Sequence, residues 1–130
     1  MRLFTGSSVR RVLAGIKFIV KILVIVNESP WGSTLPATAL RLCRAVLDGG
    51  HEIGAVFFRG DGVYNAVPGR DSESTTPDLA NAWAGLAAPL LVCSSAAARR
   101  LDRAPGGGFR EAGLAEVLER MDECDRVVTF

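Results

Sequence analysis

The apolar residues of this chain gather in short runs separated by segments with helical spacing. The first run, Lys21–Val26, is β-branched and almost continuously apolar, which is typical of a central strand buried on both faces. Further strands are predicted over 51–58 and 89–93, and a last one over 124–130. A strand is therefore expected at the start, twice in the middle and at the end of the folded region.

Between these runs, apolar positions three and four residues apart predict helices. One helix is expected over about 34–47 and a short one over 94–100, with Gly49-Gly50 ending the first. Thr76-Pro77-Asp78 is expected to open another, with a cap, a proline and an acid in its first turn. The apolar positions are Leu35, Ala39, Leu42, Cys43, Val46 and Leu47; then Leu79, Ala82, Trp83 and Leu86; and finally Leu114, Val117, Leu118 and Met121.

The alternation of strand and helix predicts a three-layer α/β/α fold with a mostly parallel sheet of about five strands. In such a sheet, the loops that follow the strands line a crevice at the strands' carboxyl ends. Here these loops are 27–33 and 59–65. The polar segment 68–76 is expected to be an exposed loop, and 104–108 a flexible break, because glycine, proline and small polar residues dominate both.

Residues 1–20 differ from the rest, because they carry four basic residues and no acid. Lys17 and Lys21 interrupt the apolar run 16–26, which argues against a signal peptide or a membrane span. We expect 1–20 to be an extension outside the fold, explained by a start codon set too far upstream, and 21–130 to be a single domain.

Composition narrows the range of functions. The 130 residues include 15 basic and 14 acidic side chains, a net charge of +1, so direct binding to nucleic acid is not expected. The three cysteines lie far apart with no C-x-x-C pair, which argues against a disulfide framework and a zinc site and suits a cytoplasmic protein. There is no Gly-rich phosphate-binding motif, so no cofactor is predicted.

The strongest chemical candidate is Cys93, at the end of the third apolar run and before an alanine-rich helix. Ser94 or Ser95 is expected to cap that helix, whose free N–H groups and dipole would favour a thiolate. The alternative is a cysteine that packs as a small apolar residue. Cys43 lies in a helical apolar stripe and Cys124 at the entry of the last strand, so both are interpreted as structural.

Two polar residues in the loop after the second strand, Tyr64 and Asn65, are expected to line the same crevice as Cys93. Alternatively, Tyr64 packs and Asn65 forms a turn. The only histidine, His51, lies at the start of a strand and is a poor partner for a catalytic cysteine. Arg99 and Arg100 could attract an acidic partner or simply solvate the helix end.

From Lys21 to Phe130 the chain resembles the DsrE/TusD family of sulfur-relay proteins. No single motif is strong, but their order and spacing extend over nearly the whole domain. The matching stretches are Gly50-His51-Glu52, Val56-Phe57-Phe58, Gly62-Val63-Tyr64-Asn65-Ala66, Asp78-Leu79, Ala82-Trp83, Cys93-Ser94-Ser95-Ala96-Ala97-Ala98-Arg99-Arg100 and Cys124-Asp125-Arg126-Val127-Val128-Thr129-Phe130.

The resemblance implies a small α/β domain whose Cys93 carries sulfur as a persulfide. It implies a heterohexamer with related TusB/TusC-like or DsrH/DsrF-like subunits, a TusA-like donor and a TusE/DsrC-like acceptor. The sulfur would serve tRNA 2-thiouridine synthesis or dissimilatory sulfur oxidation, and the TusD-like spacing favours the first. The chain departs from the family at Ser94 and Ser95, where more apolar residues are expected, and in the short, glycine-rich segment after Arg100.

Two other hypotheses remain at this point. One is a non-catalytic assembly subunit of the same kind of complex, in which Cys93 only packs. The other is an α/β module that binds a small molecule and transfers nothing.

Overall fold

The computed structural model describes residues 18–68 and 78–130. Its five strands form one sheet in the order β4-β3-β2-β1-β5, and every pair is parallel. The prediction of a mostly parallel sheet of about five strands is confirmed. The strands are β1 (Lys21–Val26), β2 (Glu52–Phe58), β3 (Leu90–Cys93), β4 (Phe109–Ala112) and β5 (Arg126–Thr129).

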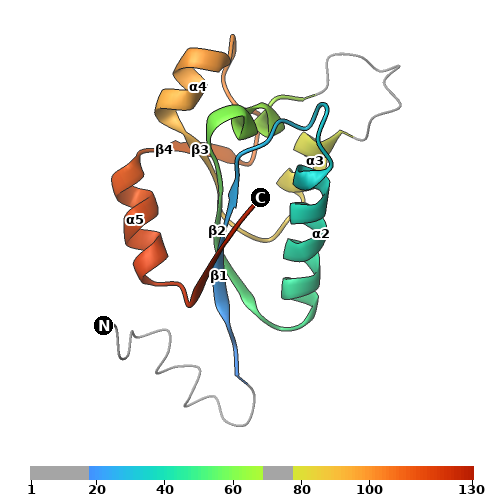
Figure 1. Ribbon diagram of the computed structural model, residues 1–130, viewed down its shortest axis with the longest axis vertical. Coiled ribbons are helices and arrows are strands. Elements are labelled where there is room, and N and C mark those ends of the chain that lie inside the picture. Colours follow the sequence, from blue (N-terminus) through green and yellow to red (C-terminus); the bar gives the residue numbers. More distant parts are fainter. Residues whose placement is uncertain (1–17, 69–77) are drawn as a thin grey trace.

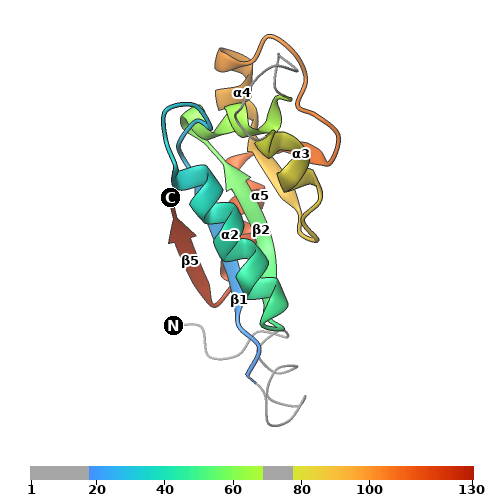
Figure 2. The same ribbon diagram turned by 90° about the vertical axis from the view of Figure 1, so that its right-hand side faces the viewer.

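Helices cover both faces of this sheet, as the three-layer prediction requires. Helices α2 (Leu35–Asp48) and α3 (Leu79–Ala84) lie on one face, and α5 (Leu114–Asp122) lies on the other (Figure 1). Figure 2 shows α2 running along the length of the sheet. The helix α4 (Ser94–Arg100) and the 3-10 helix η1 (Gly60–Ala66) follow β3 and β2 directly, so they stand at the carboxyl edge of the sheet.

Each face of the sheet has its own apolar cluster, because alternate residues of a strand point to opposite sides. On β1, Val24 and Val26 face the α2 side, whereas Leu23 and Ile25 face the α5 side. Trp83 is fully buried on the α2 side and meets Phe58 edge to face at 5.1 Å, so its predicted place in the core is confirmed.

A bulge in β2 makes room for a buried sulfur. Ile22 pairs with Ile53 and Leu23 pairs with Ala55, so Gly54 is passed over in the register. A Cβ atom on Gly54 would come within 2.5 Å of Cys124 Sγ. Cys124 is buried in the cluster on the α5 side, which confirms its structural interpretation.

Several local features differ from the expectations. Strand β4 was not predicted, because Arg110 and Glu111 are exposed on an edge strand and hide the apolar pattern. The predicted turn after β2 is the 3-10 helix η1. Helix α3 is capped by Asp78, whose carboxylate accepts a hydrogen bond from Asn81 N. The proposed cap Thr76 and most of the expected loop lie outside the described residues.

The expected N-terminal extension also lies largely outside the described residues, which begin at Phe18. Val20 packs against the core, and its backbone N–H donates a hydrogen bond to His51 Nδ1 at 3.0 Å. Over the described ranges, no helix has the length and apolarity needed to cross a membrane.

Candidate functional site around Cys93

Cys93 is the last residue of β3 and the N-cap of α4. The prediction that Ser94 or Ser95 caps this helix is wrong, since the helix begins at Ser94 and neither serine forms a capping hydrogen bond. The strand passes into the helix without a connecting loop, so the turn is made by the backbone of Cys93 itself. The thiol is therefore placed directly beside the first free N–H groups of α4.

Several groups around Cys93 act on its pKa in opposite directions. Partial burial raises it, whereas the Ser95 hydroxyl, the backbone N–H groups of Ala96 and Ser95 and the charge of Arg59 lower it. The lowering effects prevail, and the pKa of Cys93 lies below its ordinary value. The Ser95 hydroxyl lies 3.4 Å from Cys93 Sγ. The site thus favours the nucleophilic thiolate.

The other two cysteines have different surroundings. Cys43 is fully buried under α2, and this burial raises the pKa of its thiol to about 12. Cys124 is buried beside the Gly54 bulge. Cys93 is the only one of the three thiols that is partly exposed.

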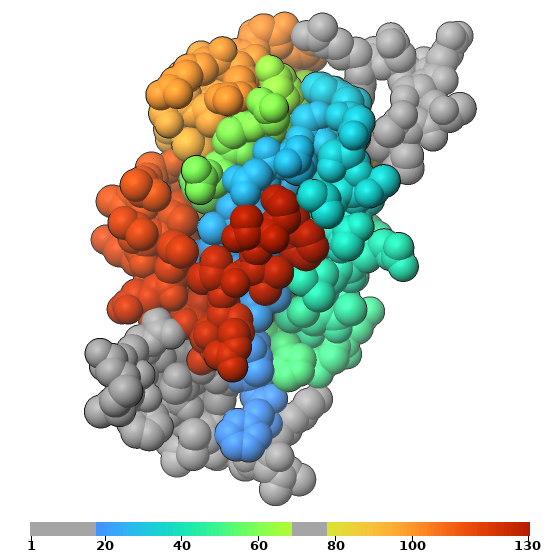
Figure 3. Space-filling model, in the orientation of Figure 1, coloured from blue at the N-terminus to red at the C-terminus, as the bar shows by residue number. Residues whose placement is uncertain are grey.

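A hollow of about 610 Å³ opens beside Cys93, between α4 and α5. We call it the Cys93 groove. Figure 3 shows α4 and α5 on the same flank of the molecule, with the segment after β2 between them. Its lining includes Arg59, Cys93, Ser95, Leu114, Leu118 and Met121.

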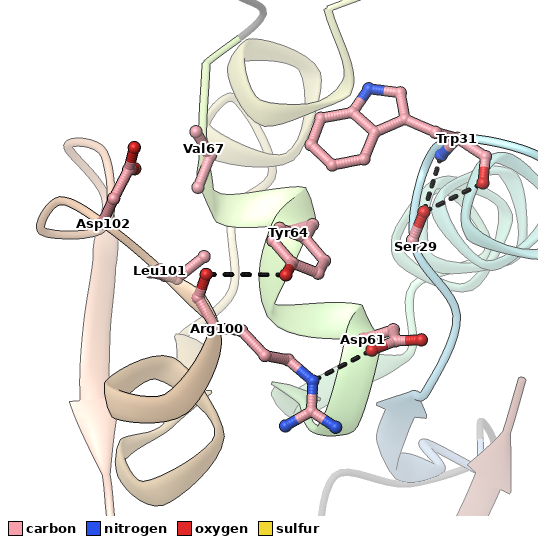
Figure 4. Close-up of a pocket in the computed structure, with 8 residues that line it drawn as sticks. All are labelled: Ser29, Trp31, Asp61, Tyr64, Val67, Arg100, Leu101 and Asp102. Carbon is pink, nitrogen blue, oxygen red and sulfur yellow. Dashed lines mark hydrogen bonds and ion pairs between the residues drawn. The ribbon is translucent and has the colours of Figure 1, made fainter.

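Tyr64 lies in a second pocket, of about 740 Å³, which Cys93 does not line. Its ring faces that of Trp31 at a centroid distance of 5.3 Å (Figure 4). Arg100 closes one side through an ion pair with Asp61 at 2.9 Å. Arg100 therefore pairs with a carboxylate of this chain, and Tyr64 lines a pocket that Cys93 does not line.

Asn65 is buried and holds two loops together. Its side-chain amide donates hydrogen bonds to the carbonyl oxygens of Glu28, at 3.0 Å, and Gly62, at 2.9 Å. The structure therefore brings Ser94 and Ser95 to Cys93 but does not bring Tyr64 or Asn65 there. The alternative interpretation, in which Asn65 shapes a turn, agrees with these contacts.

The sequence interpretation missed the three residues that give the Cys93 groove its character, namely Arg59, Leu114 and Leu118. A signal for Arg59 was present, since it directly follows β2 at the carboxyl edge of the sheet. The two leucines were assigned only to the apolar stripe of a helix. His51 precedes β2, at the opposite edge from Cys93, so the two residues form no catalytic pair.

The described residues contain no group of three or more histidine, cysteine or carboxylate side chains arranged to hold a metal ion. Fold and site together define a small three-layer α/β protein with one accessible thiol at the carboxyl edge of a parallel sheet. The chain belongs to the DsrE/DsrF-like family, which matches residues 20–130.

Two curated relatives are the proteins named "Sulfurtransferase TusD" from Salmonella newport (strain SL254) and Salmonella paratyphi B (strain ATCC BAA-1250 / SPB7). Each is 34% identical to this chain over 124 residues, which cover 82% of this chain and 97% of the relative. The crystal structure of the ychN protein from E. coli matches with a TM-score of 0.72 at 21% identity, covering 86% of this chain and all of the other. This last likeness concerns the fold.

Proposed function

We propose that this protein is a sulfurtransferase that accepts sulfur on Cys93 as a persulfide and passes it to a partner protein. The names of the curated relatives support sulfur transfer. The observation that carries the assignment to Cys93 is its position: it is the partly exposed cysteine, and its surroundings lower its pKa.

In the first step, the Cys93 thiolate attacks the outer sulfur of a donor persulfide. A bond forms between Cys93 Sγ and that sulfur, and the donor's own S–S bond breaks. The donor leaves as a thiolate, and the proton of the persulfide stays on the transferred sulfur. This step is a thiol–disulfide exchange and requires no external oxidant.

In the second step, a thiolate of the acceptor attacks the outer sulfur carried by Cys93. The S–S bond to Cys93 breaks and Cys93 leaves as a thiolate. A lowered pKa helps here, because a thiol of lower pKa is a better leaving group. The same surroundings thus prepare Cys93 to accept sulfur and to release it.

The family resemblance sets the context of this proposal. A TusA-like protein is the donor, a TusE/DsrC-like protein is the acceptor, and related small subunits complete a heterohexamer in the cytoplasm. The relatives' names favour tRNA 2-thiouridine synthesis over dissimilatory sulfur oxidation as the destination of the sulfur. The domain that performs this task is 21–130, with 1–20 as an extension.

The test is intact-protein mass spectrometry after incubation with a cysteine desulfurase, cysteine and a TusA-like carrier. The wild type is expected to gain the mass of one sulfur atom, which a reductant removes. Cys93→Ser should gain nothing, and Cys43→Ala, which removes a buried thiol, should gain sulfur like the wild type.

A wild type that stays unloaded while the carrier itself is persulfidated would contradict the proposal and favour the assembly-subunit alternative. Loading of Cys93→Ser would place the sulfur on another cysteine.

A further inference from the structure

We propose that the Cys93 groove selects the partner segment that delivers or removes sulfur, and that this segment carries apolar side chains next to its cysteine and a carboxylate close by. This inference rests on the proposed function. It specifies which side chains the partner segment should carry, because the groove presents an apolar wall and one positive charge to that segment.

The apolar wall is formed by α5. Leu114 is 67% exposed and Leu118 55% exposed, although both lie on the side of α5 that lines the groove. Two large, exposed apolar side chains that line the same groove as Cys93 are typical of a surface that binds another molecule. An incoming segment with apolar side chains beside its cysteine would bury them.

The charge is that of Arg59. Among the described residues that line the groove, Arg59 is the only charged one, and no carboxylate lines it. Arg59 and Cys93 line the same groove, so a segment that brings its cysteine to Cys93 also meets the positive charge of Arg59. A partner with a carboxylate near its cysteine would therefore find an attractive site here, and one with a lysine there would be repelled.

The wall is also held in place. On α5, the carboxylate of Glu116 receives hydrogen bonds from Arg110 of β4 and from Arg120. Arg120 also donates to the carbonyl oxygen of Gly54 in β2, at 3.3 Å. These contacts tie α5 to two strands and fix the position from which Leu114 and Leu118 project. The volume of about 610 Å³ lies within the range of small-ligand pockets, so it suits a short extended segment.

The test uses short cysteine peptides activated as mixed disulfides with thionitrobenzoate. The Cys93 thiolate attacks the peptide sulfur, a Cys93–peptide disulfide forms, and thionitrobenzoate leaves as a coloured thiolate. Four peptides are compared, with leucine or serine on both sides of the cysteine and with glutamate or glutamine two residues further on. No persulfide is involved, so this experiment can succeed or fail independently of the sulfur-loading test.

The wild type is expected to react about tenfold faster with the leucine peptide than with the serine peptide. Leu118→Ser should remove most of that preference. Val127→Ser, which replaces an apolar side chain that is 43% exposed on β5 and outside the groove, should keep it. The wild type should also react faster with the glutamate peptide than with the glutamine peptide, and Arg59→Gln should abolish that preference. This ratio is unaffected by any change in the reactivity of Cys93 itself.

Equal rates for the leucine and serine peptides would overturn the inference. So would a wild type that self-associates in size-exclusion chromatography and becomes monomeric as Leu118→Ser, because the leucines would then form an interface between copies of the chain. Urea midpoints within error of the wild type are expected for Leu118→Ser and Val127→Ser, since both changes are at exposed positions.

Discussion

The hydroxyl of Ser95 lies 3.4 Å from the sulfur of Cys93, two residues earlier at the start of the same helix. Ser95 is one of the two positions after Cys93 at which the chain carries a serine where its family resemblance leads us to expect a more apolar residue. A serine in this place can donate a hydrogen bond to the thiolate, which an apolar side chain cannot. The departure therefore supports the chemistry of the site.

Replacing Ser95 by alanine should make Cys93 less reactive. The Ser95 hydroxyl is one of the groups that lower the pKa of Cys93, so Ser95→Ala should raise that pKa and leave less thiolate at neutral pH. We expect alkylation by iodoacetamide at pH 7 to slow roughly threefold and the midpoint of its pH profile to move to higher pH. The neighbouring Ser94→Ala is the matched control and should behave like the wild type.

The three thiols should differ sharply in their rates of reaction with a thiol reagent in the folded protein. Ellman's reagent should titrate one thiol quickly in the native wild type and none in Cys93→Ser, because Cys43 and Cys124 are buried. For Cys43, the pKa of about 12 further suppresses the thiolate. All three thiols of the wild type should react in denaturant. A second fast thiol in the native state would contradict the assignment.

A methyl group at Gly62 should destabilise the fold. Its Cβ would lie 2.0 Å from the carbonyl oxygen of Val26, where η1 crosses the end of β1. The three nearest atoms all belong to the backbone of Val26 and Asn27, so we expect Gly62→Ala to lower the free energy of unfolding by at least about 2 kcal/mol in urea titrations. Gly107→Ala, where a Cβ meets nothing within 4 Å, serves as the control and should change stability little.

Acid should weaken the attachment of α5. Hydrogen bonds from Arg110 and then Arg120 hold the pKa of Glu116 at about 2, below an ordinary glutamate value of about 4.3. A depressed folded-state pKa gives stability that is present above about pH 4.3 and is lost as pH falls through about 2. Urea midpoints measured from pH 5 to pH 2 should therefore fall less steeply for Glu116→Gln than for wild type.

Glu119→Gln removes the same charge from an exposed position on α5 and should retain the wild-type dependence on pH. If both variants flattened the curve equally, the effect would belong to net charge rather than to the contacts of Glu116. The expected difference is small, since ion pairs at the surface contribute little.

The sequence predicted the central elements of the fold because their patterns are long and unmixed. The run Lys21–Val26 is apolar after its first residue, and the helix that follows it was predicted to within a residue at each end. Strand β4 carries two charged residues within four positions, so its sequence alone does not predict a strand; it becomes one by pairing with β3. Because β4 lies at the edge of the sheet, its charged side chains can remain exposed to solvent.

The site was predictable only in part. Cys93 could be found because a buried strand and a helix meet at one residue, which is a local pattern. Tyr64 was expected nearby because its loop also follows a strand, yet η1 carries it towards Trp31 and a different pocket. Arg59 directly follows β2, so its place at the carboxyl edge of the sheet could be predicted, but that it shares a groove with Cys93 depends on the pairing of β2 with β3 and on the packing of α5.

Strand β5 is the last of the five to be synthesised, yet it pairs with β1, the first. Asp125 N donates to Lys21 O at 2.7 Å, and Phe130 N donates to Ile25 O at 2.8 Å. While the chain grows on the ribosome, the edge of β1 that later pairs with β5 therefore has no hydrogen-bond partner. That pairing is a contact between the first and the last strand of the sheet, so it can form only after β5 has been synthesised.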